Sequence, residues 1–380
     1  MLHPEYFEHA ADDILTIYEK LDDSIIEEIC AEISKYGKLG KLSKWQAERI
    51  QEAGLIYDKV ISLIGKQLNK SDEAIKRLFE EAAVESIKID DGIYEKAGLS
   101  PIPLLQSKTM LETLQAGLEK TGGIMHNLTL TTANAAQQAY INACDLAYMQ
   151  ITSGAMDYNR AFELAIKNAI NDCSMVLYPS GHRDQLDVAI RRAVLTGINQ
   201  TSAKAQIIRM DELGCDLVET TAHGGARPSH AEWQGRIFSR SGRSRKYPDF
   251  VSSTGYGTGA GLCGWNCRHS FYPYFDGIST PAYSTQQLQY YNRIVGEYNG
   301  RKYNEYEASQ VQRAFERKIR VIKRQMVGFG EAKQENQYLQ TIYIDLAAML
   351  DQKTEEMSAF LKAVKRLKDI SRLKVNNYDL

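Results

Sequence analysis

Cysteines and histidines gather in one short part of the chain, around the stretch GLCGWNCRHSFYPYF. Cys263 and Cys267 are three residues apart by intervening count, and His223, His230 and His269 lie in the same region. Thiolate sulfur and imidazole nitrogen are the ligands that tetrahedral zinc prefers. Cys263, Cys267, His230 and His269 are therefore the candidate ligands of a structural zinc site. The alternative is a metal-free core in which buried thiols pack beside a tryptophan.

Cys267 is also the candidate for a reactive thiol, which requires a neighbouring base and a lowered pKa. Arg268 and His269 follow it directly, but adjacent residues of a strand point to opposite faces, which removes one of them from reach. The stretch supplies no third residue that would orient a base. Thiol hydrolysis stays an alternative, and we expect this segment to hold a small fold together.

A second enzymatic pattern lies further along the chain. SST at residues 252–254 and EYE, with Glu305 and Glu307, faintly resemble the paired motifs of ADP-ribosyltransferases. That family carries its motifs on strands around an NAD cleft, whereas these glutamates lie in a tyrosine-rich stretch that we expect to be helical. ADP-ribosyl transfer is therefore kept as an alternative, and the prediction is that the protein is not an enzyme and needs no cofactor other than the zinc considered above.

The residues around the cysteines indicate a compact fold of short strands and loops. CDLVETT, GRIFSRS and RHSFYPYF are β-branched or aromatic runs of strand length, and Gly-, Ser- and Pro-rich loops separate them. We expect three short strands here, with Trp233 and Trp265 in their core. Asn266 and Arg268 are expected to bond loop carbonyls that have no partner in the sheet.

The rest of the chain predicts helices, because apolar residues recur at steps of three and four. Breaks are expected at Ser71, at 121–123 and at 327–330, and the chain from Thr285 onward is expected to be helical. The expected fold class is mainly α with a small α+β domain, in which long helices flank a compact insert of about three strands. The expected regions are a helical region 1–100, a helical domain 101–214, the α+β domain 215–282 and C-terminal long helices 283–380.

Charge and composition exclude several classes of protein. A net charge of −2 over 380 residues excludes a uniformly basic nucleic-acid binder. No apolar run reaches the roughly eighteen residues of a membrane span, and the first residues are acidic, unlike a signal peptide. We therefore expect synthesis in a cytoplasm, no membrane partner, and six cysteines that are free thiols.

Local charge is uneven and predicts two kinds of contact. One loop carries five cations with no acid among them, and it could contact DNA or an acidic partner; a merely solvated loop is the alternative. Its cations are Arg236, Arg240, Arg243, Arg245 and Lys246. The first thirty-five residues are strongly acidic, which predicts an exposed face for docking another protein.

A near-heptad apolar stripe runs along the C-terminal region and predicts one long amphipathic helix. Its members are Leu339, Ile342, Leu346, Met349, Met357, Phe360, Val364 and Leu367. Packing within the same chain is one interpretation, and a homo-oligomer through the C-terminal helices is the other.

The stretches TTAHGGARPSHAEWQGRIFSRSG, YPDF and GYGTGAGLCGWNCRHSFYPYFDGIS together resemble the phage minor capsid protein 2 family, which is similar to the Mu F-like head-morphogenesis proteins. The match covers roughly residues 215–285, and His269 stands where the Mu F-like proteins have a second cysteine. The residues that match the family motif are Arg227, His230, Gly235, Trp265, Asn266, Cys267 and Arg268.

This resemblance implies a minor structural component of the head of a tailed phage or prophage. Such a protein would lie in the capsid interior near the portal, bind the portal and other head proteins, and act in procapsid assembly or in DNA packaging and delivery. Region 1–100 would be the candidate portal-facing part. A DNA-contacting internal head protein is the alternative, and nothing in the family pattern requires catalysis.

Overall fold

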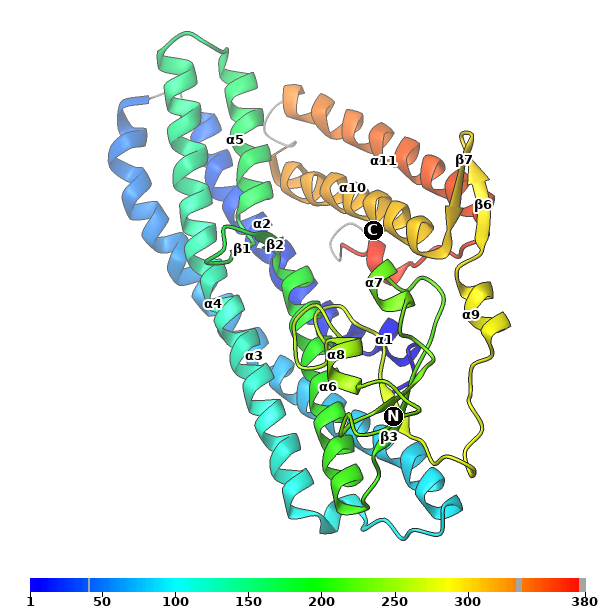
Figure 1. Cartoon of the computed structure of the whole chain (residues 1–380). Helices are drawn as coiled ribbons and strands as arrows, with labels where there is room; N and C mark the ends of the chain where they lie inside the picture. Colours follow the sequence, from blue (N-terminus) through cyan, green and yellow to red (C-terminus); the bar gives the residue numbers. More distant parts are fainter. Residues whose placement is uncertain (40–41, 333–336, 376–380) are drawn as a thin grey trace. The chain divides into compact units, whose positions relative to one another are not determined.

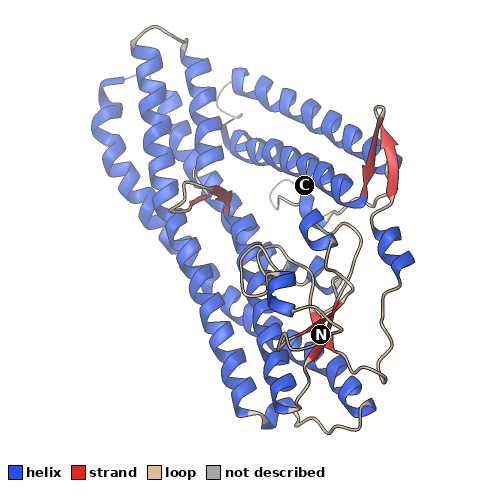
Figure 2. Ribbon diagram, in the orientation of Figure 1, coloured by secondary structure: helices blue, strands red, loops and turns tan. Residues whose placement is uncertain are grey.

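The computed structural model describes residues 1–39, 42–332 and 337–375, and these are mostly helical (Figures 1 and 2). The helices are α1 (Tyr6–His9), α2 (Asp12–Leu39), α3 (Leu42–Lys96), α4 (Lys108–Thr152), α5 (Tyr158–Asp172), α6 (Leu186–Glu212), α7 (Pro228–Ala231), α8 (Phe250–Thr254), α9 (Thr285–Tyr291), α10 (Glu305–Ala332) and α11 (Gln337–Ala363). The strands are β1 (Met175–Leu177), β2 (Arg183–Gln185), β3 (Leu217–Thr220), β4 (Ile237–Ser239), β5 (Phe271–Pro273), β6 (Ile294–Tyr298) and β7 (Arg301–Asn304). The expected fold class, mainly α with a small α+β part, is confirmed.

The chain forms two compact units, each assembled from three separate segments. The motif-bearing unit comprises Met1–Asp13, Asp72–Met125 and Arg191–Gln310, and the helical unit comprises Ile14–Ser71, His126–Ile190 and Val311–Leu380. Several boundaries between the segments fall inside long helices, among them α3, α4, α6 and α10. The four consecutive regions drawn from the sequence stay a prediction.

The three strands expected between residues 215 and 282 form one antiparallel sheet, with β3 between β4 and β5. Val218 at the centre of β3 pairs with Phe238 of β4 and with Pro273 of β5. Each strand is only three or four residues long, so the sheet relies on its side chains for stability. Val218, Phe238 and Phe271 belong to a buried cluster that also contains Trp233.

Two of the expected helix breaks are sites of close helix packing. Thr121 lies within α4, and a Cβ on Gly197 of α6 would approach its Oγ1 to 2.2 Å. Thr201 of α6 covers Gly117 of α4 in the same way, again at 2.2 Å. In α10, a Cβ on Gly328 would lie 2.5 Å from a methyl of Ile170. The prediction of breaks was wrong at both places, because α4 continues through 121–123 and α10 continues through 327–330.

The expected break at Ser71 is also absent, since α3 continues through it and the Ser71 hydroxyl donates to the Leu68 carbonyl (2.8 Å). A serine inside a helix can bond its own preceding turn instead of capping a new one. The Pro-rich stretch after Lys96 does end α3, as expected.

The expectation of continuous helix from Thr285 onward was wrong. Only α9 is helical before the antiparallel hairpin of β6 and β7, which Figure 2 shows in red. Asn299 and Gly300 form its turn with φ of 50° and 79°, the left-handed pair that a tight hairpin requires. The Asn-Gly pair was the sequence signal for this hairpin, and the tyrosine spacing obscured it.

Much of the apolar stripe packs within the same chain, although Met349 is 48% exposed and α11 ends at Ala363, before the last two members of the stripe. Leu339, Leu346 and Met357 are buried, and the Phe360 ring lies 5.9 Å from that of Phe315 on α10. Leu367, at the end of the stripe, is 91% exposed. Homo-oligomerisation through this region stays a prediction.

The acidic face expected near the N-terminus is only partly exposed: Glu5, Glu8 and Asp13 are exposed, but other acids are not. Asp22, Asp23 and Glu32 of α2 are buried, contrary to the prediction. Asp22 pairs with Arg324 of α10 (2.9 Å), and Glu32 pairs with Lys59 of α3 (2.9 Å). Asp22 and Glu32 therefore form ion pairs with cations of the helical unit and do not face solvent.

Hydropathy gives no membrane-spanning segment: among the residues that the structure describes, no helix is both long enough and apolar enough to cross a bilayer.

Candidate functional site

Short elements of the motif-bearing unit bring two family-motif side chains, His230 and Cys267, together with His269. His230 lies on α7, which begins at Pro228, while Cys267 and His269 lie in the loop that leads into β5. One nitrogen from each histidine and the Cys267 sulfur all lie within 4.8 Å of one another. We call His230, Cys267 and His269 the His–Cys cluster. Sequence reasoning proposed these three, and the fold brings them together from positions up to 39 residues apart.

The cluster is compact and lies inside the domain. Nδ1 of His230 is 3.5 Å from Nδ1 of His269. The Cys267 sulfur is 3.7 Å from the first of these nitrogens and 3.6 Å from the second. The residues are 2% (His230), 6% (Cys267) and 1% (His269) exposed, so no part of the cluster faces open solvent.

Hydrogen bonds on the far side of each ring fix which nitrogen carries the proton. Nε2 of His230 donates to the Ala260 carbonyl (2.8 Å). Nε2 of His269 contacts Oε1 of Gln234 (3.0 Å), which also accepts from the backbone N–H of His223 (3.1 Å). A backbone N–H can only donate, so this Gln234 atom is the oxygen and Nε2 of His269 is a donor. Both Nδ1 atoms therefore present lone pairs to the interior of the cluster.

Burial keeps all three groups neutral. Burial lowers the pKa of His230, and it lowers the pKa of His269 well below the usual value, with nearby cationic groups adding to the effect. Burial raises the pKa of Cys267 to about 11. A reactive cysteine needs the opposite shift, so the geometry gives no support to thiol hydrolysis.

Cys263, the fourth expected ligand, is buried but stands outside the cluster. Its sulfur lies 3.6 Å from the His269 carbonyl oxygen, and burial raises the pKa of its thiol. The backbone of Cys263 is left-handed, with φ of 59°. His223 is close as well: its ring lies 4.4 Å from that of His269, and burial lowers its pKa to about 4.

Helix α6 supplies supports that sequence reasoning missed. Asn199 is 1% exposed, and its amide donates to the carbonyls of Cys267 (3.0 Å) and His269 (3.1 Å). Gln206, two turns further along, donates to the Phe271 carbonyl (2.7 Å). The signal available in the sequence was a pair of amides on the apolar face of an amphipathic helix.

The two tryptophans have different environments. Trp233 is buried, with its ring 4.6 Å from that of His230 and 4.9 Å from that of His269. Trp265 is 62% exposed, so its expected place in the core was wrong. Arg227 donates to the Trp265 carbonyl (2.6 Å) and thereby ties the start of α7 to the cysteine loop.

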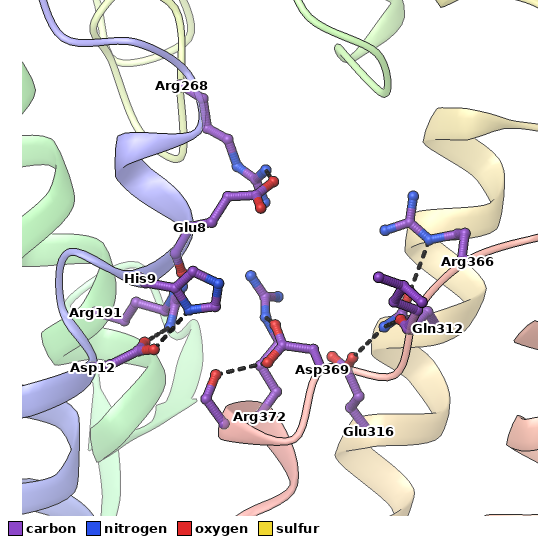
Figure 3. Close-up of polar contacts among 12 residues, drawn as sticks. Glu8, His9, Asp12, Arg191, Arg268, Gln312, Glu316, Arg366, Asp369 and Arg372 are labelled. Carbon is purple, nitrogen blue, oxygen red and sulfur yellow. Dashed lines mark hydrogen bonds and ion pairs between the residues drawn. The ribbon is translucent and has the colours of Figure 1, made fainter.

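The remaining motif residues shape the backbone or bridge segments. Arg268 pairs with Glu8 of α1 (2.9 Å), as Figure 3 shows. Asn266 is exposed and left-handed, with φ of 54°. Gly235 has φ of 64°, and a Cβ there would lie 2.8 Å from Leu288. A side chain at position 235 would therefore face both strain and collision.

The predicted basic loop is partly neutralised. Arg240 pairs with Asp211 and donates to the Cys215 carbonyl (2.8 Å). Lys246 pairs with Asp276 (2.8 Å). The cations that are exposed and form no ion pair among the described residues are Arg236, Arg243 and Arg245. Figure 3 also shows two arginines near the C-terminal end that are engaged, Arg366 with Gln312 and Arg372 with Asp369.

Glu307 has the contacts of a helix cap. Its backbone N–H donates to Oδ1 of Asn304 (2.8 Å), and its carboxylate accepts from the Asn304 N–H (3.1 Å). This reciprocal pair is a capping box at the start of α10. The carboxylate also pairs with Arg301 (3.2 Å), so its geometry gives no support to ADP-ribosyl transfer.

Comparison with known proteins places the chain among phage proteins. No solved structure matches it. It is 23% identical over 300 residues to a structural protein of Lactococcus phage LL-H, covering 74% of this chain and 76% of that protein. It is 36% identical over 75 residues to a structural protein of Lactococcus phage mv4, covering 20% of this chain and 51% of that protein. The model of the family described as phage minor capsid protein 2 matches residues 2–362. This match spans nearly the whole chain, so the protein belongs to the phage minor capsid protein 2 family and is a structural protein of a bacteriophage.

Proposed function

We propose that this minor capsid protein binds the portal inside the phage head and acts in procapsid assembly or in DNA packaging and delivery. The observation that carries the proposal is that the family-motif residues His230, Cys267 and Arg227 serve the fold of the domain itself. His230 and Cys267 are buried, and Arg227 bonds a loop backbone. Motif residues with these contacts maintain the fold of the domain. A constant fold provides a constant surface on which other head proteins can assemble.

The surface proposed to face the portal lies on α3, within region 1–100. Glu80, Glu81 and Glu85 are exposed there, and Val84 between them is 59% exposed. Residues at these spacings share one side of a helix. An apolar side chain among acids suits a partner surface that combines a small pocket with basic residues.

Co-expression with the portal protein encoded in the same phage, followed by size-exclusion chromatography, tests this proposal. The two proteins should co-elute, and the triple variant E80K/E81K/E85K should reduce the co-eluting fraction at least tenfold. The control D345K/D351K/E355K reverses three exposed acids of α11 and should co-elute like the natural protein. Separate elution of two folded proteins would contradict the proposal.

A second function, contact with packaged DNA, is supported by a specific observation. Arg236, which precedes β4, and Arg243 and Arg245, which follow it, are exposed and form no ion pair among the residues described. Each phosphate contact should make binding weaken with salt. The triple change of these arginines to Gln should remove salt-dependent binding of duplex DNA, while K66Q/K70Q/K76Q, which removes the same charge from exposed positions of α3, should retain it.

Arg240 is left out of that DNA-binding test, because it pairs with Asp211 and bonds a backbone carbonyl within the domain. A change at Arg240 would combine a loss of charge with a loss of stability. Equal binding by the natural protein and the arginine variant at every salt concentration would count against DNA contact at this loop.

A further inference from the structure

We propose that the His–Cys cluster is a metal site, in which Nδ1 of His230, Nδ1 of His269 and the Cys267 sulfur bind one divalent transition metal, with zinc as the best fit. The site goes beyond the proposed role in assembly, because it concerns how the α+β domain is held together and not what it binds. It assigns three ligands from the chain.

The distances between the ligand atoms fit tetrahedral zinc. Zinc bonds of about 2.0–2.1 Å to nitrogen and about 2.3 Å to sulfur place two nitrogens about 3.4 Å apart and a nitrogen and a sulfur about 3.6 Å apart. The cluster has 3.5 Å between the nitrogens of His230 and His269. The sulfur of Cys267 lies 3.7 Å and 3.6 Å from them. One ion can therefore contact all three atoms with little movement of the chain.

Hydrogen-bonding capacity inside the cluster also points to a cation. Each Nδ1 offers a lone pair, because each Nε2 already donates, to Ala260 on one side and to Gln234 on the other. Cys267 has a single S–H, which can satisfy only one of the two nitrogens. A buried acceptor without a donor costs free energy. A metal ion bound in place of the thiol proton satisfies both nitrogens and the sulfur together.

The surroundings have the form that metal-binding histidines require. A ligating histidine usually donates its other N–H to a carbonyl or carboxylate, which fixes the ring, and here a backbone carbonyl and the Gln234 side chain accept these bonds. The Asn199 side chain donates to the backbone carbonyls of two ligand residues, Cys267 and His269, and so fixes the backbone at both. The Trp233 ring covers both imidazoles. The ligands are therefore held in place before a metal arrives.

We expect the bound metal to stabilise the α+β domain, which has little regular secondary structure. Its sheet strands are three or four residues long, and long loops join them. Metal binding to ligands that only the folded chain brings together adds to the free energy of folding. The metal would join α7 to the loop before β5, the two segments that carry most of the family motif.

Cobalt titration of the full-length protein, stripped of metal with a chelator, tests the proposal without relying on stability. One Co²⁺ per chain should bind and give visible bands of tetrahedral cobalt together with a thiolate-to-cobalt charge-transfer band, and one equivalent of Zn²⁺ should remove them. Cys267→Ser should abolish the charge-transfer band. The control Cys215→Ser changes another buried cysteine of the same core and should leave the spectrum unchanged.

A second variant keeps the test decisive even where Cys267→Ser does not fold. Gln234→Ala removes the acceptor of the His269 N–H while leaving all three ligands, and it should lower the affinity for Zn²⁺ by about 10–100-fold. No binding of Zn²⁺ or Co²⁺ by the natural protein would overturn the proposal. A charge-transfer band that persists in folded Cys267→Ser would overturn it as well.

Discussion

Each unit contains a buried polar group, the Arg324 network in the helical unit and the His–Cys cluster in the motif-bearing unit. The two differ in how well their hydrogen-bond donors and acceptors are matched. In the helical unit, Arg324 of α10 donates to Asp22 (2.9 Å) and also to Ser174 and Gln185, while Ser174 donates to Gln185 (3.2 Å). Donors and acceptors are matched there, and the charges of Arg324 and Asp22 oppose each other. In the His–Cys cluster, lone pairs outnumber protons.

This difference separates a structural network from a ligand site. A buried charge requires its partner, so a matched pair holds helices in place and has no capacity left for anything else. Neutral groups can remain with unused lone pairs at a smaller cost. The converging acceptors of His230 and His269 are therefore available to a ligand such as the proposed metal, whereas the acceptors around Arg324 are already engaged.

The largest effect is expected from Arg324→Met. This change leaves Asp22 buried without its main cation and should lower the free energy of unfolding by about 3–5 kcal/mol in chemical denaturation. The double variant Arg324→Met/Asp22→Leu should recover most of the loss. Arg183→Met breaks an exposed pair with Asp172 and should cost at most about 1 kcal/mol. An equally small cost at Arg324 would remove the contrast between the units.

Asn199→Ala tests the support of the His–Cys cluster. It leaves the carbonyls of Cys267 and His269 without their donor and should cost about 2 kcal/mol in the same measurement. Gln138→Ala, which removes an exposed amide bonded to Asn142 on α4, should change stability by at most about 0.5 kcal/mol. Equal effects of the two substitutions would show that α6 does not position the cluster.

Glu19 shows that pairing in the helical unit is incomplete. Burial, aided by Asp187, raises its pKa to about 7, while Arg320 opposes the shift. A carboxyl group whose pKa is raised by folding favours the folded state at pH values below its pKa in the unfolded chain. This contribution is lost as the pH rises through about 7. Glu19→Gln should therefore raise stability by about 1–2 kcal/mol at pH 8 relative to its effect at pH 4.5.

Denaturation at both pH values measures this difference. The control Glu5→Gln changes an exposed carboxylate and should alter stability by at most about 0.5 kcal/mol. A gain for Glu19→Gln that is larger at the lower pH would contradict the assignment, because the sign of the dependence follows from a raised pKa.

The smallest effect is expected where the polar group is partly exposed. Glu307→Ala removes half of the capping box with Asn304 and should lower the free energy of unfolding by about 1 kcal/mol. Glu307→Gln keeps an oxygen that can accept the same hydrogen bond, so it should lose less stability than Glu307→Ala. Thermal denaturation would detect the difference. NAD turnover by the natural protein that disappears in Glu307→Ala would instead favour the enzymatic alternative.

Local patterns were enough to predict the elements of the fold that depend on near neighbours. The β-branched and aromatic runs around Val218, Phe238 and Phe271 became the three strands of the sheet. The stripe through Leu346 and Phe360 became α11. These predictions succeeded because the period of apolar residues along a chain reports directly which face is buried.

Features that depend on distant parts of the chain were not predictable in the same way. Gly117 and Gly197 each accommodate a threonine of the facing helix, which no pattern near them in the sequence indicates. Trp265 looked like a core residue and lies on the surface. Asn199 gave no local sign that it would hold two carbonyls of a loop 68 and 70 positions away.

The sequence by itself determined the helical class, the small sheet and the residue types able to bind a metal. Only the tertiary structure decided that His230, Cys267 and His269 converge without Cys263, and that both Nδ1 atoms turn their lone pairs inward. The physical reason is that residue type sets what a side chain can donate or accept, whereas its protonation and its partners depend on groups that folding brings near it.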